Sequence, residues 1–272
     1  MRTLLLAGML AVGCGAARQG VSQTPSWATK SGRDHAKMEL AAALLDNGNA
    51  EAALQLLGQM LAQGVSGPDV SVLQGRALAA MGLTDDAERV LGRVTRRHPG
   101  NAEAANSLGI LYMDDKRVDE AISRFRQAAR AAPKDAQVHN NLGFALMAAG
   151  RNDEAVDVLR DALTFDGSRH RTRNNLGFAL VAMGQDKAAW RVFRAGVDPA
   201  NARYNLALAQ ELRGDMTAAM GSYSAALEEN PDLDDARSAL TRLQAAIPTE
   251  APTSNDDSPQ TDVSSPTEET AQ

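Results

Sequence analysis

The sequence predicts an all-α protein built as an elongated array of repeated helix pairs. Ala, Leu, Arg, Asp and Glu are abundant in the 272 residues, only 4% are aromatic, and no run rich in Val, Ile and Thr alternates with polar residues as strands do. The segment 140–146 also recurs unchanged as residues 174–180, 34 positions later. A fixed internal period predicts stacked copies of one helical unit rather than a single globular core.

Small residues recur at two positions of this period when the first copy is numbered from Asp34. Position 8 holds Ala41, Gly75, Gly109, Gly143, Gly177 and Ala207, and position 20 holds Ala53, Ala87, Ala121, Ala155, Ala189 and Ala219. We expect the backbones of the two helices to approach most closely there, because larger side chains would force the pair apart. Position 24 is large and apolar, which predicts a core side chain between one pair and the next: Leu57, Leu91, Phe125, Leu159, Phe193 and Tyr223.

Glycine and proline mark the expected helix ends. Position 15 carries Gly48, Gly82, Gly150, Gly184 and Gly214, and only Lys116 departs from this pattern. A glycine there predicts a left-handed C-cap for the first helix of each copy. Pro99, Pro133 and Pro231 predict the end of the second helix, because proline does not continue a helix.

A 34-residue period with these positions resembles the tetratricopeptide repeat (TPR) family. The resemblance implies a right-handed superhelix, an α-solenoid of about six helix-turn-helix repeats. We place the array at residues 34–247, with repeats at 34–67, 68–101, 102–135, 136–169, 170–199 and 200–233 and a capping helix at 234–247. The fifth repeat is four residues short, which is about one helical turn.

By resemblance to the family, the first helices of the repeats line a concave groove that receives a partner segment. An asparagine ladder and an apolar stripe are expected on its wall, and the candidate site residues are Asn106, Ile110, Asn140, Asn141, Phe144, Met147, Arg171, Asn174, Asn175, Phe178, Tyr204, Asn205 and Leu208, with Met113 and Val181 extending the stripe. Asparagine amides suit a peptide backbone, whereas exposed apolar side chains mark interaction surfaces. The alternatives are asparagines that bind water or cap helices, and apolar side chains covered by neighbouring helices or by the spacer.

The densest basic cluster of the array is residues 169–173, with Arg169, Arg171 and Arg173. Positive charge at a helix N-terminus opposes the helix dipole, so the cluster fits either a carboxylate partner or chance clustering. Family members that grip a carboxylate place Lys or Arg beside groove asparagines, and only Arg171 with Asn141 and Asn175 matches that arrangement here.

The N-terminus predicts export. Met1 to Thr3 carry one positive charge, and an apolar run follows from Leu4 to Val12, too short to span a bilayer and typical of a signal peptide. Residues 11–14 resemble the bacterial lipobox. This resemblance implies cleavage after residue 13, lipidation of Cys14 and a flexible spacer at residues 14–33, with the lipid anchored in the outer membrane facing the periplasm. The alternative is an ordinary signal peptide with a chance cysteine.

The C-terminal residues 248–272 contain six acids and no base, in a Pro-, Ser- and Thr-rich context. This composition predicts a disordered acidic tail. The remaining 28 acids balance the 28 basic residues of the chain, so the array lacks the positive charge that nucleic-acid binding requires.

Nothing in the sequence predicts catalysis or a cofactor. His35, His98, His139 and His170 have no metal-ligand spacing with each other or with Cys14. A phosphate-binding glycine loop and a nucleophile elbow are also missing from the sequence. We therefore expect a non-catalytic scaffold for protein–protein interaction, without metal.

The architecture resembles the TadD lipoproteins of Tad/Flp pilus assembly and the pilotins of type IV pilus secretins. This resemblance implies a membrane-anchored protein that assists assembly of a pilus or secretion complex, with a secretin or pilus component as partner. The alternative is a periplasmic scaffold that recruits a cell-wall enzyme or an outer-membrane protein assembly partner.

Overall fold

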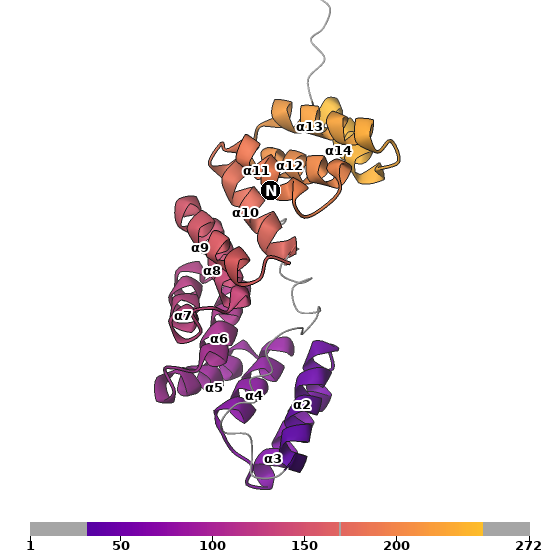
Figure 1. Cartoon of the computed structure of the whole chain (residues 1–272). Helices are drawn as coiled ribbons and strands as arrows, with labels where there is room; N and C mark the ends of the chain where they lie inside the picture. Colours follow the sequence, from indigo (N-terminus) through magenta and orange to yellow (C-terminus); the bar gives the residue numbers. More distant parts are fainter. Residues whose placement is uncertain (1–31, 169, 247–272) are drawn as a thin grey trace, which may run out of the picture.

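The computed structural model describes residues 32–168 and 170–246, and all regular structure within these ranges is α-helical. Thirteen helices succeed one another there, from α2 in indigo to α14 in yellow (Figure 1). They are α2 Gly32–Asp46, α3 Ala50–Ala62, α4 Pro68–Ala80, α5 Thr84–Arg97, α6 Ala102–Asp114, α7 Val118–Ala131, α8 Ala136–Ala148, α9 Asn152–Phe165, α10 His170–Ala182, α11 Asp186–Arg194, α12 Pro199–Arg213, α13 Met216–Glu229 and α14 Asp234–Ala245.

The helices form six pairs, and we call the first helix of each pair the A helix and the second the B helix. Within a pair the two helices are joined by a turn of only two or three residues and pack against each other. Successive A helices also contact one another directly, from α2 and α4 through to α10 and α12. The pairs therefore stack into an α-solenoid whose inner wall is made by A helices, which confirms the predicted fold class.

Every A-to-B turn has the same backbone bonds. The residue at position 15 has a positive φ, about 75° at Gly82 and Gly184, and the next residue donates back to the fifth residue before it, as Leu83 N does to Leu78 O at 2.9 Å. Lys116 adopts this left-handed conformation too, with φ 61°. The expected C-caps are thus present at all six turns, including the one that lacks glycine.

The interior of the second to fifth pairs depends on the glycine at position 8. A Cβ at Gly177 would lie 2.3 Å from Phe193 Cε1, and one at Gly109 would lie 2.6 Å from the same atom of Phe125. The nearest atoms are those of the position-24 side chain in the same repeat. The glycine therefore makes room for that side chain within the pair, a contact that was not predicted. Phe125 also borders Asn141 and Phe144 of the next pair, as expected for position 24.

The fifth pair has a short B helix. Helix α11 has 9 residues, whereas α9 and α13 have 14. The chain turns at Gly196 and enters α12 at Pro199, where the Asp198 carboxylate accepts a hydrogen bond from Asn201 N at 3.1 Å. This cap and the proline fix the start of α12 without the missing helical turn.

Helix α14 covers the last pair. Ala236 and Leu243 are buried against the cluster that contains Tyr223 and Ala226, while the charged side chains of Asp235 and its neighbours are exposed. An array needs such a helix because its final apolar face would otherwise meet water.

Candidate binding groove

From the family resemblance we expect positions 2, 5, 6, 9, 12 and 13 of the A helices to line the inner wall of the solenoid. On α6, α8, α10 and α12 it carries the asparagine side chains singled out in the sequence. Asn106 lies on α6, Asn140 and Asn141 on α8, Asn174 and Asn175 on α10, and Asn205 on α12, and all of them are half-buried.

These asparagines bond to one another across neighbouring A helices. Asn141 Nδ2 donates to Asn106 Oδ1 at 3.0 Å and Asn175 Nδ2 donates to Asn140 Oδ1 at 3.0 Å. The third rung, from Asn205 Nδ2 to Asn174 Oδ1, is 3.5 Å long. The position-6 amide of one repeat thus holds the position-5 amide of the repeat before it. The ladder has a structural role in joining repeats that neither sequence interpretation included.

The ladder leaves hydrogen-bonding capacity toward the groove. Each primary amide has two N–H donors and one oxygen acceptor. Within the described residues, the Nδ2 groups of Asn106 and Asn140 have no hydrogen-bond partner, and the same holds for the Oδ1 atoms of Asn141 and Asn175. A free donor at position 5 and a free acceptor at position 6 therefore stand on adjacent residues of α8, and Asn174 and Asn175 repeat this arrangement on α10.

The expected apolar stripe is partly covered. Phe144 is 9% exposed, Met113 8% and Val181 0%, so these side chains belong to the core. Ile110, Met147, Phe178 and Leu208 are half-buried and remain on the wall. The alternative in which neighbouring helices cover the stripe is correct for the first three residues, because they pack against the adjacent A and B helices.

A shallow recess marks the wall between α6 and α8. It has a volume of about 20 Å³ and is lined by Ile110, Met113, Phe125, Asn141 and Phe144. This volume admits about one methyl-sized group or water molecule. The groove therefore offers amide groups and small apolar contacts rather than a deep pocket.

The arginines of the basic cluster at residues 169–173 have different positions in the structure. Arg173 is half-buried, donates to the backbone oxygen of Gly167, and its Cδ would lie 2.9 Å from a Cβ at Gly196. Arg173 therefore closes the turn around the short fifth pair. Arg171 is exposed at position 2 of α10, on the groove side, and Arg169 is outside the described residues.

The other end of the groove is acidic. Arg76 on α4 forms ion pairs with Asp46 at 3.4 Å and Glu103 at 3.2 Å. Asp69, at position 2 of α4, accepts a hydrogen bond from Asn101 at 3.3 Å, while its Oδ2 is buried without a partner among the described residues. Burial and the nearby Glu103 carboxylate raise the pKa of Asp69 to about 6, although the Asn101 bond acts in the opposite direction.

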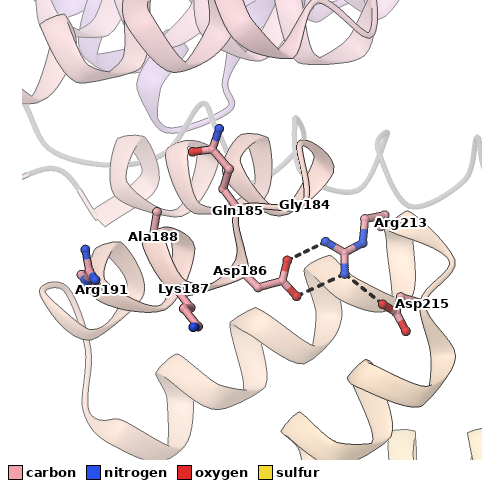
Figure 2. A pocket seen from close by; sticks show the side chains of 8 residues that line it. All are labelled: Gly184, Gln185, Asp186, Lys187, Ala188, Arg191, Arg213 and Asp215. Carbon is pink, nitrogen blue, oxygen red and sulfur yellow. Dashed lines mark hydrogen bonds and ion pairs between the residues drawn. The ribbon is translucent and has the colours of Figure 1, made fainter.

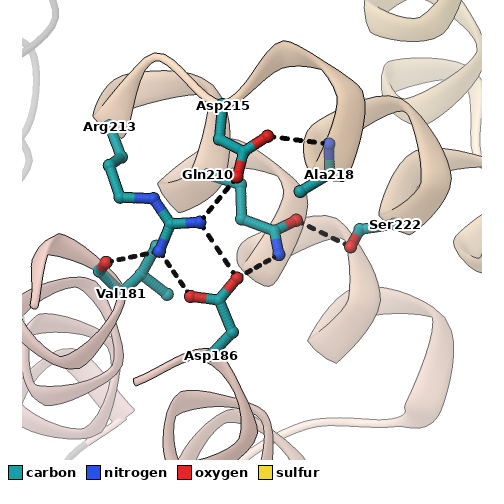
Figure 3. A network of polar contacts seen from close by, with 7 residues as sticks. All are labelled: Val181, Asp186, Gln210, Arg213, Asp215, Ala218 and Ser222. Atoms are coloured by element: carbon teal, nitrogen blue, oxygen red, sulfur yellow. Dashed lines mark hydrogen bonds and ion pairs between the residues drawn. The ribbon is translucent and has the colours of Figure 1, made fainter. Parts of the chain in front are cut away.

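A polar network that the sequence did not indicate joins the fifth and sixth pairs (Figure 3). Arg213 at the end of α12 contacts Asp186 at 2.5 Å and Asp215 at 3.0 Å, and it donates to Val181 O at 2.8 Å. Gln210 links Asp186 to Ser222, with bonds of 2.6 and 2.7 Å. Burial raises the pKa of Asp186, but hydrogen bonds from Arg213 and Gln210 outweigh it, so the net shift is downward.

An open hollow lies beside this network (Figure 2). Its volume is about 720 Å³, and it is lined by Gly184, Gln185, Asp186, Lys187, Ala188, Arg191, Arg213 and Asp215. The lining comes from the α10–α11 turn, α11 and the α12–α13 turn. The hollow is therefore at the edge of the array and is distinct from the asparagine ladder.

Several sequence predictions concern residues that the structure does not describe. Cys14, the signal peptide, most of the spacer and the acidic tail lie outside residues 32–246. Across the described ranges, no group of histidine, cysteine and acidic side chains is arranged to hold a metal. The same residues include no helix that is long and apolar enough to cross a bilayer.

The sequence model of the tetratricopeptide repeat family matches residues 72–123, 108–170 and 187–234, together more than half of the chain. The chain belongs to the tetratricopeptide repeat family. Such proteins are generally non-catalytic scaffolds whose concave surfaces bind protein or peptide partners.

Solved structures share the fold. YrrB, described as a TPR protein with an unusual peptide-binding site, is 18% identical with a TM-score of 0.55, and the match covers 68% of this chain and 97% of that one. A MamA structure, "41-end from Desulfovibrio magneticus RS-1", is 22% identical with a TM-score of 0.51, covering 61% and 94%. Another MamA structure is 22% identical with a TM-score of 0.52, covering 62% and 94%. Curated protein sequences gave no match.

Proposed function

We propose that this chain is a scaffold that binds an extended segment of a partner protein along the asparagine ladder of its groove. The observation that carries the proposal is the hydrogen bonding of position-6 amides to position-5 amides. These bonds hold the side chains in place and leave the Nδ2 groups of Asn106 and Asn140 and the Oδ1 atoms of Asn141 and Asn175 without partners among the described residues. An extended backbone presents alternating C=O and N–H groups that suit such a row of donors and acceptors.

The apolar contacts of the groove complete this proposed site. Ile110, Phe178 and Leu208 are half-buried on the wall, and the recess at Ile110 and Phe144 accepts one small apolar group. Met147, Tyr204 and Arg171 are included in the site because they share the same face of the A helices. Affinity would come from backbone hydrogen bonds, and the apolar contacts would set the preference for particular side chains.

We further propose that Cys14 is lipidated and anchors the array in the bacterial cell envelope, at the outer membrane on its periplasmic side. Residues 11–14 and the apolar run before them support this. Stable anchoring needs two or more acyl chains. Cys14→Ser should move the protein from the membrane fraction to the soluble periplasmic fraction. If the variant stays in the membrane fraction, lipidation is not the anchor.

In that location we propose that the groove assists assembly of a pilus or secretion complex, with a secretin or pilus component as the bound partner. The support is the resemblance to lipidated TPR proteins of pilus assembly. A deletion strain should fail to assemble its secretin or pili, and normal assembly in that strain would exclude this role while leaving the groove proposal open.

The groove is tested with a variant that preserves the ladder. Asn140→Asp/Asn174→Asp keeps the Oδ1 acceptors for Asn175 and Asn205 but replaces the free Nδ2 donors with acceptors. Asn47→Asp/Asn230→Asp adds the same charge at exposed turn residues and serves as the control. In pull-downs from membrane fractions, the captured secretin or pilus component should be lost only from the groove variant. Equal capture by both variants would place binding elsewhere.

A further inference from the structure

The outer face of α11 carries three basic side chains. Lys187, Arg191 and Arg194 recur at a spacing of four and three residues, and all three are exposed. Residues at this spacing share one side of a helix. The corresponding faces differ in charge, since α9 presents Asp153, Asp157 and Arg160 and α13 presents Thr217, Gly221 and Ser224.

These three cations are not used by the fold. Within the described ranges, the side chains of Lys187, Arg191 and Arg194 make no hydrogen bond or ion pair. The acid closest in sequence, Asp186, is bonded to Arg213 and Gln210 instead. Figure 2 shows that Lys187 and Arg191 point away from the Asp186–Arg213–Asp215 cluster. The positive charge of this face is therefore available to a ligand.

Lys187 and Arg191 also border the open hollow of about 720 Å³. A hollow next to uncompensated cations has both room and charge for an acidic chain segment. Its lining also includes Asp215 and Asp186, and Arg213 offsets one of these two negative charges, so that Lys187 and Arg191 leave the lining with a net positive charge. An acidic segment would consequently meet a net positive border rather than a repulsive one.

The chain itself supplies such a segment. Residues 248–272 contain Glu250, Asp256, Asp257, Asp262, Glu268 and Glu269 and no basic residue. We propose that this C-terminal segment docks intramolecularly on the outer face of α11, with its carboxylates against Lys187, Arg191 and Arg194. The contact is on the opposite side of the pair from the groove and is independent of the proposed function.

The distances permit this contact. Helix α14 packs against α13, α13 against α12 and α12 against α11, and helix axes in contact are about 8–10 Å apart, so the path is roughly 30 Å. Asp256 lies ten residues after Ala246, and an extended chain of that length reaches about 33–36 Å. Tethering further raises the effective concentration of the segment to the millimolar range, which makes weak ion pairs sufficient.

Zero-length carbodiimide cross-linking of the full mature chain tests the proposal. The reagent joins a lysine amine to a carboxylate in contact with it, so Lys187 should be linked to the 248–272 peptide in mass spectra. Lys116 and Lys134 are exposed elsewhere and serve as internal references. Mixing unlabelled and ¹⁵N-labelled protein distinguishes links within one chain from links between two copies.

The variants keep Lys187 as the probe. Arg191→Gln/Arg194→Gln should reduce the Lys187–tail link by roughly tenfold, as should 0.5 M salt, which shortens electrostatic screening to a few ångströms. Arg93→Gln/Arg97→Gln removes two exposed, unpaired arginines of α5 and should leave the link unchanged. Equal linking of the tail to Lys116, Lys134 and Lys187 would overturn the proposal. Links found only between two copies, or a link that resists the α11 variant and salt, would overturn it as well.

Discussion

Asn175 Nδ2 donates to Asn140 Oδ1 at 3.0 Å across the boundary between α10 and α8. The same bond joins Asn141 to Asn106 one repeat earlier. The Asn-Asn pairs at residues 140–141 and 174–175 therefore link neighbouring repeats. In each pair the second asparagine donates to the preceding repeat, and the first accepts from the following repeat. The groups left free by this connection are those that face the groove.

Gly177→Ala should destabilise the array because the new Cβ would lie 2.3 Å from Phe193 in a filled interior. We expect a loss of about 1–3 kcal/mol, the usual cost of overpacking. Gly221→Ala is the matched control, since Gly221 is exposed on α13 with no atom within 4 Å of a Cβ, and it should stabilise by about 0.5–1 kcal/mol. Urea unfolding followed by circular dichroism measures both, and equal effects would contradict the packing described for position 8.

Lys116→Gly should stabilise the protein, because Lys116 is held at φ 61°. The left-handed conformation costs an L-residue about 1–2 kcal/mol, which glycine avoids. Glycine also gives the unfolded chain more conformational freedom, which cancels part of this gain, so we expect a net stabilisation of about 0.5–1 kcal/mol. Gly150→Lys makes the reverse change at the equivalent turn, where φ is 74°, and should destabilise by a similar amount. Thermal unfolding that moves in the same direction for both variants would disprove this explanation.

Asp69→Asn should stabilise the native state above pH 6 and lose this advantage in acid. The folded pKa of Asp69 is raised to about 6 by burial and by Glu103, whereas an unfolded aspartate titrates near 3.9. The native state therefore takes up a proton as the pH falls through 6, which stabilises the native protein and not the variant. Urea midpoints of both proteins between pH 4 and 8 should converge toward acid pH. Parallel curves would show that Asp69 has an ordinary pKa.

Arg213→Met should destabilise the junction of the fifth and sixth pairs. Arg213 is 24% exposed and Asp186 28%, and the substitution leaves Asp186 without its cation. Hydrogen bonds to charged groups predict a loss of about 1–3 kcal/mol. The control Arg237→Met removes an exposed pair with Asp234, where exposures are 54% and 85%, and should change stability by less than about 0.5 kcal/mol. Similar losses in denaturant unfolding would contradict a special role for the network.

The solenoid was predictable because its determinants are local and repeated. Glycine at position 15 and the alanines and glycines of positions 8 and 20 report the turn and the close packing of each pair, and they recur often enough to fix the register. The contact of Gly177 with Phe193 was not predicted, because the period gives the positions that are small and large but not the atoms that meet.

The groove was less predictable because its surface depends on how neighbouring pairs rotate against each other. Phe144 was expected on the wall and is 9% exposed, since adjacent A helices close over it. The Asn141–Asn106 bond joins residues 35 positions apart in different repeats. Arg213 and Asp186 belong to different repeats, and no sequence pattern marks the two residues as partners.

The most direct test of the groove is a calorimetric titration of the partner segment recovered in the pull-down into three proteins: native, Asn140→Asp/Asn174→Asp and the charge-matched Asn47→Asp/Asn230→Asp. Loss of two donors should weaken binding by roughly 10- to 100-fold in the first variant, with unfolding midpoints kept near native by the conserved Oδ1 acceptors, while the second variant binds as the native protein does. Equal affinities for all three proteins would contradict binding at the asparagine ladder.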